Sequence, residues 1–307
     1  MTDLIGWFTD PLQFEFMQRA ILVAVMVGLV CSVLSCWLTL LSWSLLGDAV
    51  SHAVLPGVVF SYALGLPFAI GAFVFGIASV AMIGGVNRTS RVKEDAAIGV
   101  VFTGLFALGL VLVTLVPSQI DLQHILFGNV LGVTDSEILQ VMILGSLVLA
   151  VVAVMWRSLV LYAFDPTHAH AIGISPRKLE ALLLGLLALT VVLALQAVGI
   201  VLVVAMLITP GVTAYLLTDR FRSMLLVAAA VGVFSTVLGT YVSYHLDAST
   251  GGSIVCVLTL VFLVAYLFAP QQGVLTKRRQ RRRRVRERAA ERSAFAQHEE
   301  RELTPVG

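Results

Sequence analysis

Charged residues are scarce in this chain, and their scarcity excludes an ordinary soluble domain. Only 12% of the 307 residues are Asp, Glu, Lys or Arg, whereas 59% are hydrophobic and the mean hydropathy is +0.97. Soluble domains contain about 25% charged residues. The charge is also uneven, because residues 1–276 hold nine Lys/Arg and thirteen Asp/Glu, and residues 277–307 hold eleven Lys/Arg and five Asp/Glu. The sequence therefore predicts a slightly acidic membrane-embedded body and a basic tail.

Sequence motifs of common enzyme classes are missing as well. The chain has three lysines and none of them follows a glycine, so it contains no Gly-Lys-Ser/Thr phosphate-binding loop. It also contains no CxxC, HExxH or GxSxG pattern. The three cysteines, Cys31, Cys36 and Cys256, fall in apolar runs, where we expect small buried side chains and no disulfide. We therefore do not expect an enzyme, and any ATP-driven process in which the chain takes part needs a partner that hydrolyses ATP.

Long uncharged intervals divide the chain into expected membrane spans. A helix needs about 20 apolar residues to cross the hydrocarbon core. Gly65-Leu66-Pro67 divides one interval that is too long for a single helix, and residues 196–199 divide another. We expect an all-α polytopic membrane protein with nine spans, or eight if one short segment is re-entrant. The expected spans are 20–42, 48–64, 68–87, 97–117, 137–156, 180–196, 199–217, 223–244 and 253–269.

Lys and Arg in the short loops predict the orientation of the spans. Short loops on the cytoplasmic side of a membrane carry an excess of these two residue types. Residues 88–93, 157–178 and 220–222 contain them, whereas residues 118–136 and 245–252 contain none. We therefore expect the first three loops on the cytoplasmic side and the other two outside. With nine spans, the N-terminus then lies outside.

The same reasoning divides the chain into three parts. We expect an N-terminal segment over residues 1–18, a transmembrane domain over 19–270 and a basic, disordered cytoplasmic tail over 271–307. Basic residues beside a final span gain about 1 kcal/mol each near anionic lipid, which makes lipid the expected partner of the tail. A charge run tethered at a membrane argues against a nucleic-acid partner.

Asp48 is the most unusual side chain in the apolar body, because it is the only fully charged residue between Arg19 and Arg88. An ionised group at membrane depth costs about 2.5 kcal/mol or more, so it needs a partner or a function. His52 lies four residues later, which places both side chains on one helical face. One oxygen and one nitrogen ligand suit Mn²⁺, Fe²⁺ or Zn²⁺. Two alternatives remain: Asp48, which follows Gly47, can cap a helix, and His52 can be a buried histidine with a local partner.

Two further positions are candidates for lining a pathway. Thr209-Pro210-Gly211 falls inside the expected span 199–217. Proline and glycine there indicate either an interrupted helix that lines a cavity or a structural kink. Asp247 lies in an expected outward loop, where it either lines the entrance or caps the next helix. Pro56, one turn after His52, has the same two interpretations as Pro210.

A short cytoplasmic helix is expected between the fifth and sixth spans. Asp165-Pro166 is a helix-start signal and Gly173 a helix stop, with Ala169 between them. His168 and His170 also lie in this segment. Residues two apart on a helix do not face each other, so we do not expect these two histidines to share an ion.

Five segments make this sequence resemble the permease family of metal-ion ABC importers, which is associated with manganese, zinc and iron uptake. The matches follow the family's order over most of residues 15–270. The segments are GDAVSHAVLPG at 47–57, RVKEDAAIGVVFTGLFALGLVL at 91–112, ILFGNVLGV at 125–133, AMLITPGVTA at 205–214 and SYHLDASTGGSIV at 243–255.

The resemblance implies a fold, a membrane and partners. The fold is that of a type II ABC importer permease, in the bacterial cytoplasmic (inner) membrane. The implied partners are cytoplasmic ABC ATPase subunits, an extracytoplasmic metal-binding protein and a second permease, either another copy or a related chain. The resemblance further implies that Asp48 and His52 contact the ion. It also implies that the helix containing Asp165, Pro166, Ala169 and Gly173 docks on the ATPase, although an ordinary solvated connection remains the alternative.

The expected function is import of a divalent metal ion by alternating access, driven by ATP that a partner subunit hydrolyses. The segment 51–56, Ser-His-Ala-Val-Leu-Pro, is more similar to the manganese/iron branch of the family than to the zinc branch, so Mn²⁺ is the expected ion, with Fe²⁺ and Zn²⁺ as alternatives. No permanently bound cofactor is expected. An ATP-independent secondary transporter or exporter and a non-transporting membrane scaffold have the same hydropathy and remain open.

Overall fold

The structure, a computed structural model, describes residues 10–115, 132–269 and 273, apart from the side chains of residues 88 and 94. This part of the chain is 88% helical and has no strand. It contains nine segments long and apolar enough to cross a membrane. The all-α polytopic fold and the count of nine spans are therefore confirmed. Most of the predicted basic tail, most of the segment 118–136 and most of the match at 125–133 lie outside the described residues.

The described helices begin and end within a few residues of the expected spans, except that the fifth span, α8, extends further. The second span consists of two helices, α3 and α4. In chain order the elements are η1 (Pro11–Gln13), α2 (Glu15–Leu40), α3 (Ser44–Ala53), α4 (Leu55–Ala63), α5 (Phe68–Thr89), α6 (Glu94–Leu115), α8 (Asp135–Phe164), α9 (Pro166–Ala171), α10 (Pro176–Val198), α11 (Ile200–Leu217), α12 (Phe221–Leu246) and α13 (Thr250–Phe268).

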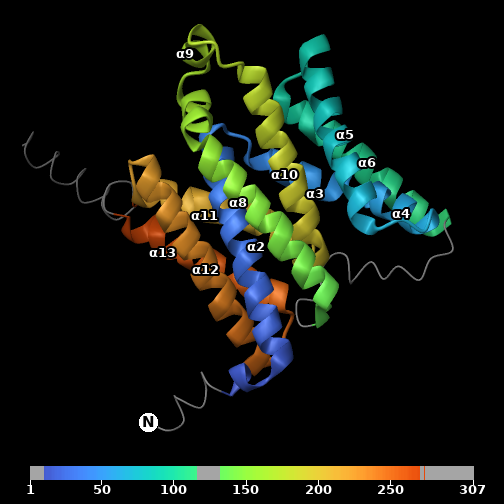
Figure 1. Cartoon of the computed structure of the whole chain (residues 1–307), viewed down its shortest axis with the longest axis vertical. Coiled ribbons are helices and arrows are strands. Elements are labelled where there is room, and N and C mark those ends of the chain that lie inside the picture. Colours follow the sequence, from blue (N-terminus) through green and yellow to red (C-terminus); the bar gives the residue numbers. More distant parts are fainter. Residues whose placement is uncertain (1–9, 116–131, 270–272, 274–307) are drawn as a thin grey trace, which may run out of the picture.

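Helix α2 is the centre of the bundle. It packs against α8, α10, α11 and α12, while α3 and α4 pack against α5 and α6 at one side of the molecule (Figure 1). The core contains large side chains that are fully buried, such as Trp37 of α2 and Met206 of α11. Helix α9 lies at the opposite end of the molecule from the start of α2 (Figure 1). This placement agrees with the expectation that residues near 165–173 and the start of α2 lie on opposite sides of the membrane.

Glycine and proline separate the spans where the sequence predicted. Gly65 adopts φ +66° and Pro67 precedes α5, which separates α4 from α5. Gly199 adopts φ +77° between α10 and α11. A positive φ is readily adopted by glycine, which has no Cβ. The break between α3 and α4 lies before Pro56, which has no N–H for the carbonyl of His52 and whose ring crowds that carbonyl.

Small residues let several helices approach closely, as is common where helices pack within a membrane. The backbones of Gly57 in α4 and Gly71 in α5 are in contact, so that a Cβ on either would overlap the carbonyl of the other. Gly71 N–H also donates to Ser61 Oγ at 3.0 Å. Helices α2 and α12 cross in a similar way at Ser32 and Gly232. These contacts fix α4 against α5 and α12 against α2.

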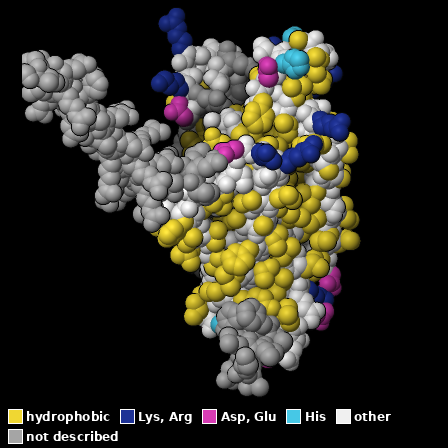
Figure 2. Space-filling view, turned by 90° about the vertical axis from the view of Figure 1, so that its left-hand side faces the viewer, with side chains coloured by type: hydrophobic (Ala, Val, Ile, Leu, Met, Phe, Trp, Pro, Cys, Tyr) yellow, Lys and Arg dark blue, Asp and Glu magenta, His cyan; other side chains and the backbone are white. Residues whose placement is uncertain are grey.

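The surface has the distribution of side chains that a membrane requires. Figure 2 shows a broad hydrophobic band, with most Lys and Arg side chains gathered toward its upper end. This agrees with the expected cytoplasmic position of the basic loops, although the orientation itself stays a prediction. Cys31 and Cys36 are buried, as expected, but Cys256 is exposed on α13. The expectation for Cys256 was wrong because an apolar run facing lipid has the same composition as one facing the protein interior.

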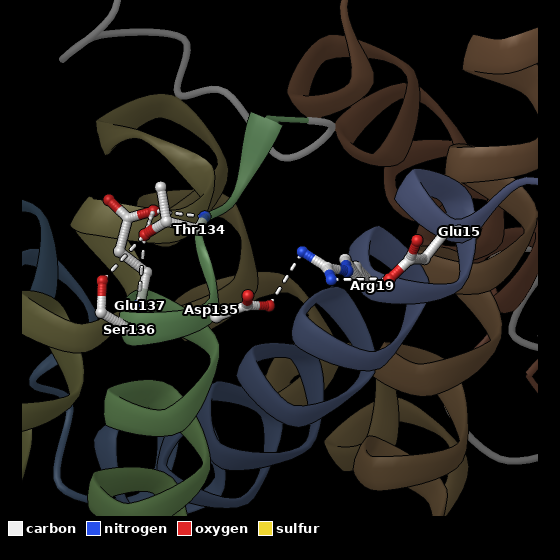
Figure 3. A network of polar contacts seen from close by, with 6 residues as sticks. All are labelled: Glu15, Arg19, Thr134, Asp135, Ser136 and Glu137. Atoms are coloured by element: carbon white, nitrogen blue, oxygen red, sulfur yellow. Dashed lines mark hydrogen bonds and ion pairs between the residues drawn. The ribbon is translucent and has the colours of Figure 1, made fainter.

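One basic residue lies at the other end of the bundle, and acidic groups surround it. Arg19 of α2 pairs with Glu15 at 2.6 Å and with Asp135 of α8 at 2.8 Å (Figure 3). Thr134 and Glu137 form a capping box that begins α8: the Glu137 carboxylate accepts from Thr134 N–H at 2.8 Å, and Glu137 N–H donates to Thr134 Oγ1 at 3.4 Å (Figure 3). This cap explains why α8 starts at Asp135, two residues before the expected span.

Candidate functional site

Asp48 lies inside helix α3 and does not begin it. The helix begins at Ser44, so Asp48 is more than one turn from the helix start, and the residue at the N-cap position is Trp43. No side chain caps this helix end. The alternative that Asp48 caps the helix was therefore wrong, because the helix extends one turn further toward the N-terminus than its charge pattern indicated.

Asp48 and His52 face each other on one side of α3. The distance from His52 Nε2 to Asp48 Oδ1 is 3.4 Å, and the side chains are 23% and 35% exposed, respectively. The predicted proximity of these two groups is confirmed, whereas their contact with an ion stays a prediction. Neither side chain is fully buried, so a small ion could approach both. It also moderates the cost of holding a charge within an apolar bundle.

Two aromatic rings of α6 cover the other side of the His52 ring. The ring centroids of Phe102 and Phe106 each lie 5.2 Å from the centroid of the imidazole. His52 Nδ1 is buried and has no hydrogen-bond partner among the described residues. The sequence reasoning missed these phenylalanines. Their spacing of four residues places them on one helical face, but apolar residues at that spacing are ordinary in any packed helix.

The pair alone does not complete a metal site. The described residues contain no group of three or more His, Cys, Asp or Glu side chains that could hold a metal ion. A divalent ion at Asp48 and His52 therefore needs water or backbone oxygens to complete its coordination shell. A site with two protein ligands suits an ion that must leave again, because conduction requires binding weak enough for release.

Helix α11 contacts the same helix next to Asp48. Leu207 lies 3.3 Å from the position of a Cβ on Gly47, so the two helices touch there. Pro210 is buried one turn later and Thr209 is partly buried, but α11 continues through both residues as one helix. Of the two interpretations of Thr209-Pro210-Gly211, the interrupted helix is therefore wrong, and the structural kink remains. Pro210 has no N–H, so one carbonyl in the preceding turn lacks its usual helical partner. A pathway-lining role for Thr209 and Pro210 stays a prediction.

Asp247 terminates α12 in a loop that the sequence predicts to lie outside. It adopts a left-handed conformation, φ +49° and ψ +44°, at the C-cap of α12, and its side chain is exposed. The next helix is capped by Ser249, whose side chain accepts from Gly252 N–H. The alternative that Asp247 caps the next helix was therefore wrong, and its role at the pathway entrance stays a prediction.

The short helix predicted after Asp165 is present as α9. The Asp165 carboxylate accepts from His168 N–H at 2.8 Å and from Thr167 Oγ1 at 2.7 Å. These hydrogen bonds lower the pKa of Asp165, the bond from His168 being the main cause. Pro166 is the first helical residue and Ala169 is fully buried against the bundle. The helix thus has a sequence-specified start and a fixed inner face.

The outer surface of α9 is polar, and apolar side chains flank it. His168 and His170 are both exposed. Phe164 before the helix and Ile172 after it are 64% and 55% exposed, respectively. Gly173, with φ +85°, ends the segment as predicted. Single exposed apolar side chains are ordinary on a protein surface, so contact between α9 and an ATPase stays a prediction beside the alternative of a solvated connection.

Comparisons with known proteins identify the family of this chain. The model of a family described as "ABC 3 transport family" matches residues 13–269. The chain belongs to this family. It is 56% identical over 271 residues to the "Manganese transport system membrane protein MntB" of Synechocystis sp., which covers 88% of this chain and 89% of that protein. It is 46% identical over 269 residues to the "Chelated iron transport system membrane protein YfeC" of Yersinia pestis, covering 88% and 92% of the two chains.

A solved structure has the same fold. The structure titled "PsaBC from Streptococcus pneumoniae in complex with Fab" contains a chain that is 38% identical, with a TM-score of 0.82 and coverage of 90% of this chain and 99% of that one. The chain is therefore a multi-pass membrane protein with the fold of an ABC importer permease. The family resemblance found in the sequence is confirmed over nearly all the described residues.

Proposed function

We propose that this protein is the permease subunit of an ATP-driven importer of divalent metal ions, with Mn²⁺ as its principal substrate and Fe²⁺ and Zn²⁺ as alternatives. The observation that carries the proposal is the Asp48–His52 pair, whose side-chain atoms lie 3.4 Å apart on α3, just before the break between α3 and α4, in a bundle whose described residues contain nine spans. Interrupted helices hold the ion sites of several transporter folds. The manganese and iron systems named for two relatives support the metal.

The energy for transport comes from partner subunits. The sequence has no phosphate-binding loop, so ATP hydrolysis belongs to a cytoplasmic ATPase. Helix α9 is the segment that we assign to the contact with this ATPase, with Phe164 and Ile172 beside it. Helix α10 contacts both α9 and α3, which offers a direct route for movement from the ATPase to the ion site. No cofactor is permanently bound, since the metal is the substrate.

Three further partners complete the proposal. An extracytoplasmic metal-binding protein delivers the ion to the outer end of the bundle, where Asp247 is exposed. A second permease, identical or related, forms the other half of the membrane unit. The chain title PsaBC for the solved relative supports an assembly with more than one kind of subunit. The basic tail meets anionic lipid beside the last span.

Metal uptake into proteoliposomes tests the proposal. Wild-type permease and its ATPase, with ATP supplied on the ATPase side, are expected to accumulate Mn²⁺. Asp48→Ala and His52→Ala are each expected to abolish accumulation while the complex still assembles. Asp135→Asn and His245→Ala, which alter the same residue types at the outer end of the bundle, serve as matched controls and are expected to retain uptake. Equal uptake by Asp48→Ala, His52→Ala and wild type would remove the site assignment.

The same experiment separates this function from the two other classes. Uptake that persists without ATPase or ATP would identify a secondary transporter. A membrane scaffold predicts no metal uptake by the wild-type complex and no effect of replacing Asp48. Comparing Mn²⁺, Fe²⁺ and Zn²⁺ in the same vesicles ranks the three candidate ions.

A further inference from the structure

An aromatic wall closes one side of the Asp48–His52 site. The wall consists of Phe102 and Phe106 of α6, whose rings stack on each other with centroids 6.2 Å apart. Each ring also lies 5.2 Å from the imidazole of His52. Because both rings come from one face of α6, and α6 packs along α3, they cover the imidazole together. The wall is therefore part of the α3–α6 interface and not a single chance contact.

The wall takes the place of the usual support for a metal-binding histidine. Such a histidine commonly donates its second ring N–H to a carboxylate, carbonyl or water, which orients the ring and increases its basicity. The buried Nδ1 of His52 has no such partner among the described residues. Phe106 instead meets the imidazole at 85°, an edge-to-face geometry that is favourable between aromatic rings. Packing against the two phenyl rings therefore orients His52, with Nε2 toward Asp48.

The wall also limits which atoms can surround an ion. The face of α6 that carries Phe102 and Phe106 continues to Gly109, which packs against Leu55 of α4. From Phe102 to Gly109 the side chains of this face carry no oxygen, and the hydroxyl of the neighbouring Thr103 is exposed and donates to the carbonyl of Gly99. Between Phe102 and Gly109, α6 therefore turns apolar side chains and no oxygen ligand toward His52.

We propose that Phe102 and Phe106 are selectivity-determining residues, which disfavour Ca²⁺ and Mg²⁺ by keeping water and oxygen ligands away from the α6 side of the site. The inference rests on the proposed function and adds a physical reason why the site would prefer transition-metal ions to Ca²⁺ and Mg²⁺. Ca²⁺ takes six to eight oxygen ligands, and Mg²⁺ keeps several of its waters in octahedral geometry. Fe²⁺ and Zn²⁺ accept imidazole nitrogen more readily than these two ions do, and Mn²⁺ does so less than Fe²⁺, so discrimination by the wall should be strongest for Fe²⁺ and Zn²⁺ and smaller for Mn²⁺.

Competition between ions in the proteoliposome assay tests this inference. Mn²⁺ uptake is measured at increasing Ca²⁺ and, separately, Mg²⁺ for the wild type and for Phe102→Ala and Phe106→Ala. We expect the Ca²⁺ concentration that halves Mn²⁺ uptake to fall by about tenfold or more in each alanine variant, on the scale seen when groups around metal ligands are altered. Phe102→Leu and Phe106→Leu keep an apolar wall and are expected to stay within about twofold of the wild type.

A matched control tests whether any lost phenyl ring has the same effect. Phe60 of α4 stacks on Phe75 of α5 at 5.8 Å, which is a similar ring pair away from His52. Phe60→Ala is expected to leave the Ca²⁺ sensitivity unchanged. If one alanine variant fails to assemble, the other alanine variant provides the comparison, and equilibrium binding of Mn²⁺ and Ca²⁺ to its purified complex confirms the result.

The outcomes separate this inference from the proposed function. Unchanged Ca²⁺ and Mg²⁺ sensitivity in both alanine variants, with uptake still dependent on Asp48 and His52, would overturn the role of the wall and leave the proposed function intact. Increased sensitivity in Phe60→Ala as well would overturn it too, because the effect would then be general. Failure of the wild-type complex to take up any of the metals would overturn both.

Discussion

Replacing Gly71 with alanine is expected to destabilise the protein, because α4 and α5 leave no room for a methyl group. A Cβ at Gly71 would overlap the carbonyl of Gly57 and lie against Ser61 Oγ. The main obstacle is backbone, which cannot rotate away as a side chain can. The two helices must therefore move apart, and the hydrogen bond from Gly71 N–H to Ser61 Oγ, 3.0 Å long, must stretch.

The size of the effect follows from two opposing contributions. Overpacking a well-packed interface costs about 1–3 kcal/mol. Alanine regains up to about 1 kcal/mol over glycine inside a helix. The expected net loss of unfolding free energy for Gly71→Ala is therefore about 1–2 kcal/mol. Gly84 in the same helix is the matched control, because a Cβ there meets nothing within 4 Å. Gly84→Ala should leave the stability unchanged or raise it by up to about 1 kcal/mol.

Thermal unfolding in detergent, followed by tryptophan fluorescence, measures the difference. A change of 1 kcal/mol shifts Tm by about 2–4 °C in chains of 150–250 residues, so Gly71→Ala should unfold several degrees below the wild type. Because α4 continues α3, which contains Asp48 and His52, Gly71→Ala should also lower metal uptake. If Gly71→Ala unfolds at or above the wild-type temperature while Gly84→Ala behaves as expected, α4 and α5 do not pack as closely at Gly57 and Gly71 as the prediction requires.

Three further predictions concern the ends of helices. Thr134→Ala removes the cap of α8 and should lower the free energy of unfolding by about 1 kcal/mol in the same thermal assay. Asp135→Asn removes an exposed ion pair and should lower it by less than about 1 kcal/mol. Equally large losses in the two variants would contradict the role of the cap. Asp165 has a lowered pKa, so its hydrogen bonds stabilise α9 above the ordinary carboxyl pKa and are lost as the pH falls through the lowered value. Asp165→Ala should therefore speed amide exchange in α9 at neutral pH, and this difference should vanish in acid; a constant difference at all pH values would exclude the carboxylate as the cause. His168→Cys should react with a membrane-impermeant thiol reagent added on the cytoplasmic side, and Asp247→Cys with the same reagent added outside. The reverse result would show that the predicted orientation is wrong.

Most of the fold could be predicted from the sequence because lipid imposes simple rules. A span must be long and apolar, so charge-free intervals identified all nine, and Gly65 and Gly199 separated neighbouring helices at the expected places. Helix ends were less predictable. Helix α3 begins before Asp48, and α8 begins at a capping box with Thr134, since local hydrogen bonds and packing decide the final turn. Lipid-facing and buried positions were also indistinguishable by composition, which explains the error for Cys256.

The polar half of the candidate site could be predicted, but its apolar half could not. Asp48 is conspicuous in an uncharged interval, and the helical period of 3.6 residues brings His52 beside it. Phe102 and Phe106 approach His52 only because α6 packs on α3, and nothing in the period of α6 indicates that partner. At Pro210, the local signal for a break was overridden by packing, since α11 continues through it.

The position of the break has a consequence for where the ion is held. The span Ser44–Ala63, which α3 and α4 form with Val54 between them, contains 20 residues, about 30 Å of helix, and Asp48 and His52 lie about 6 Å and 12 Å from its start. With the predicted orientation, that start is cytoplasmic, so the pair belongs to the inner half of the pathway. The Gly57–Gly71 contact fixes α4 to α5, while the break before Pro56 separates α3 from it. With this orientation, an ion arriving from outside passes α4 first and meets Asp48 and His52 on α3, near the cytoplasmic start of the span, which is where a checkpoint before release into the cytoplasm is needed.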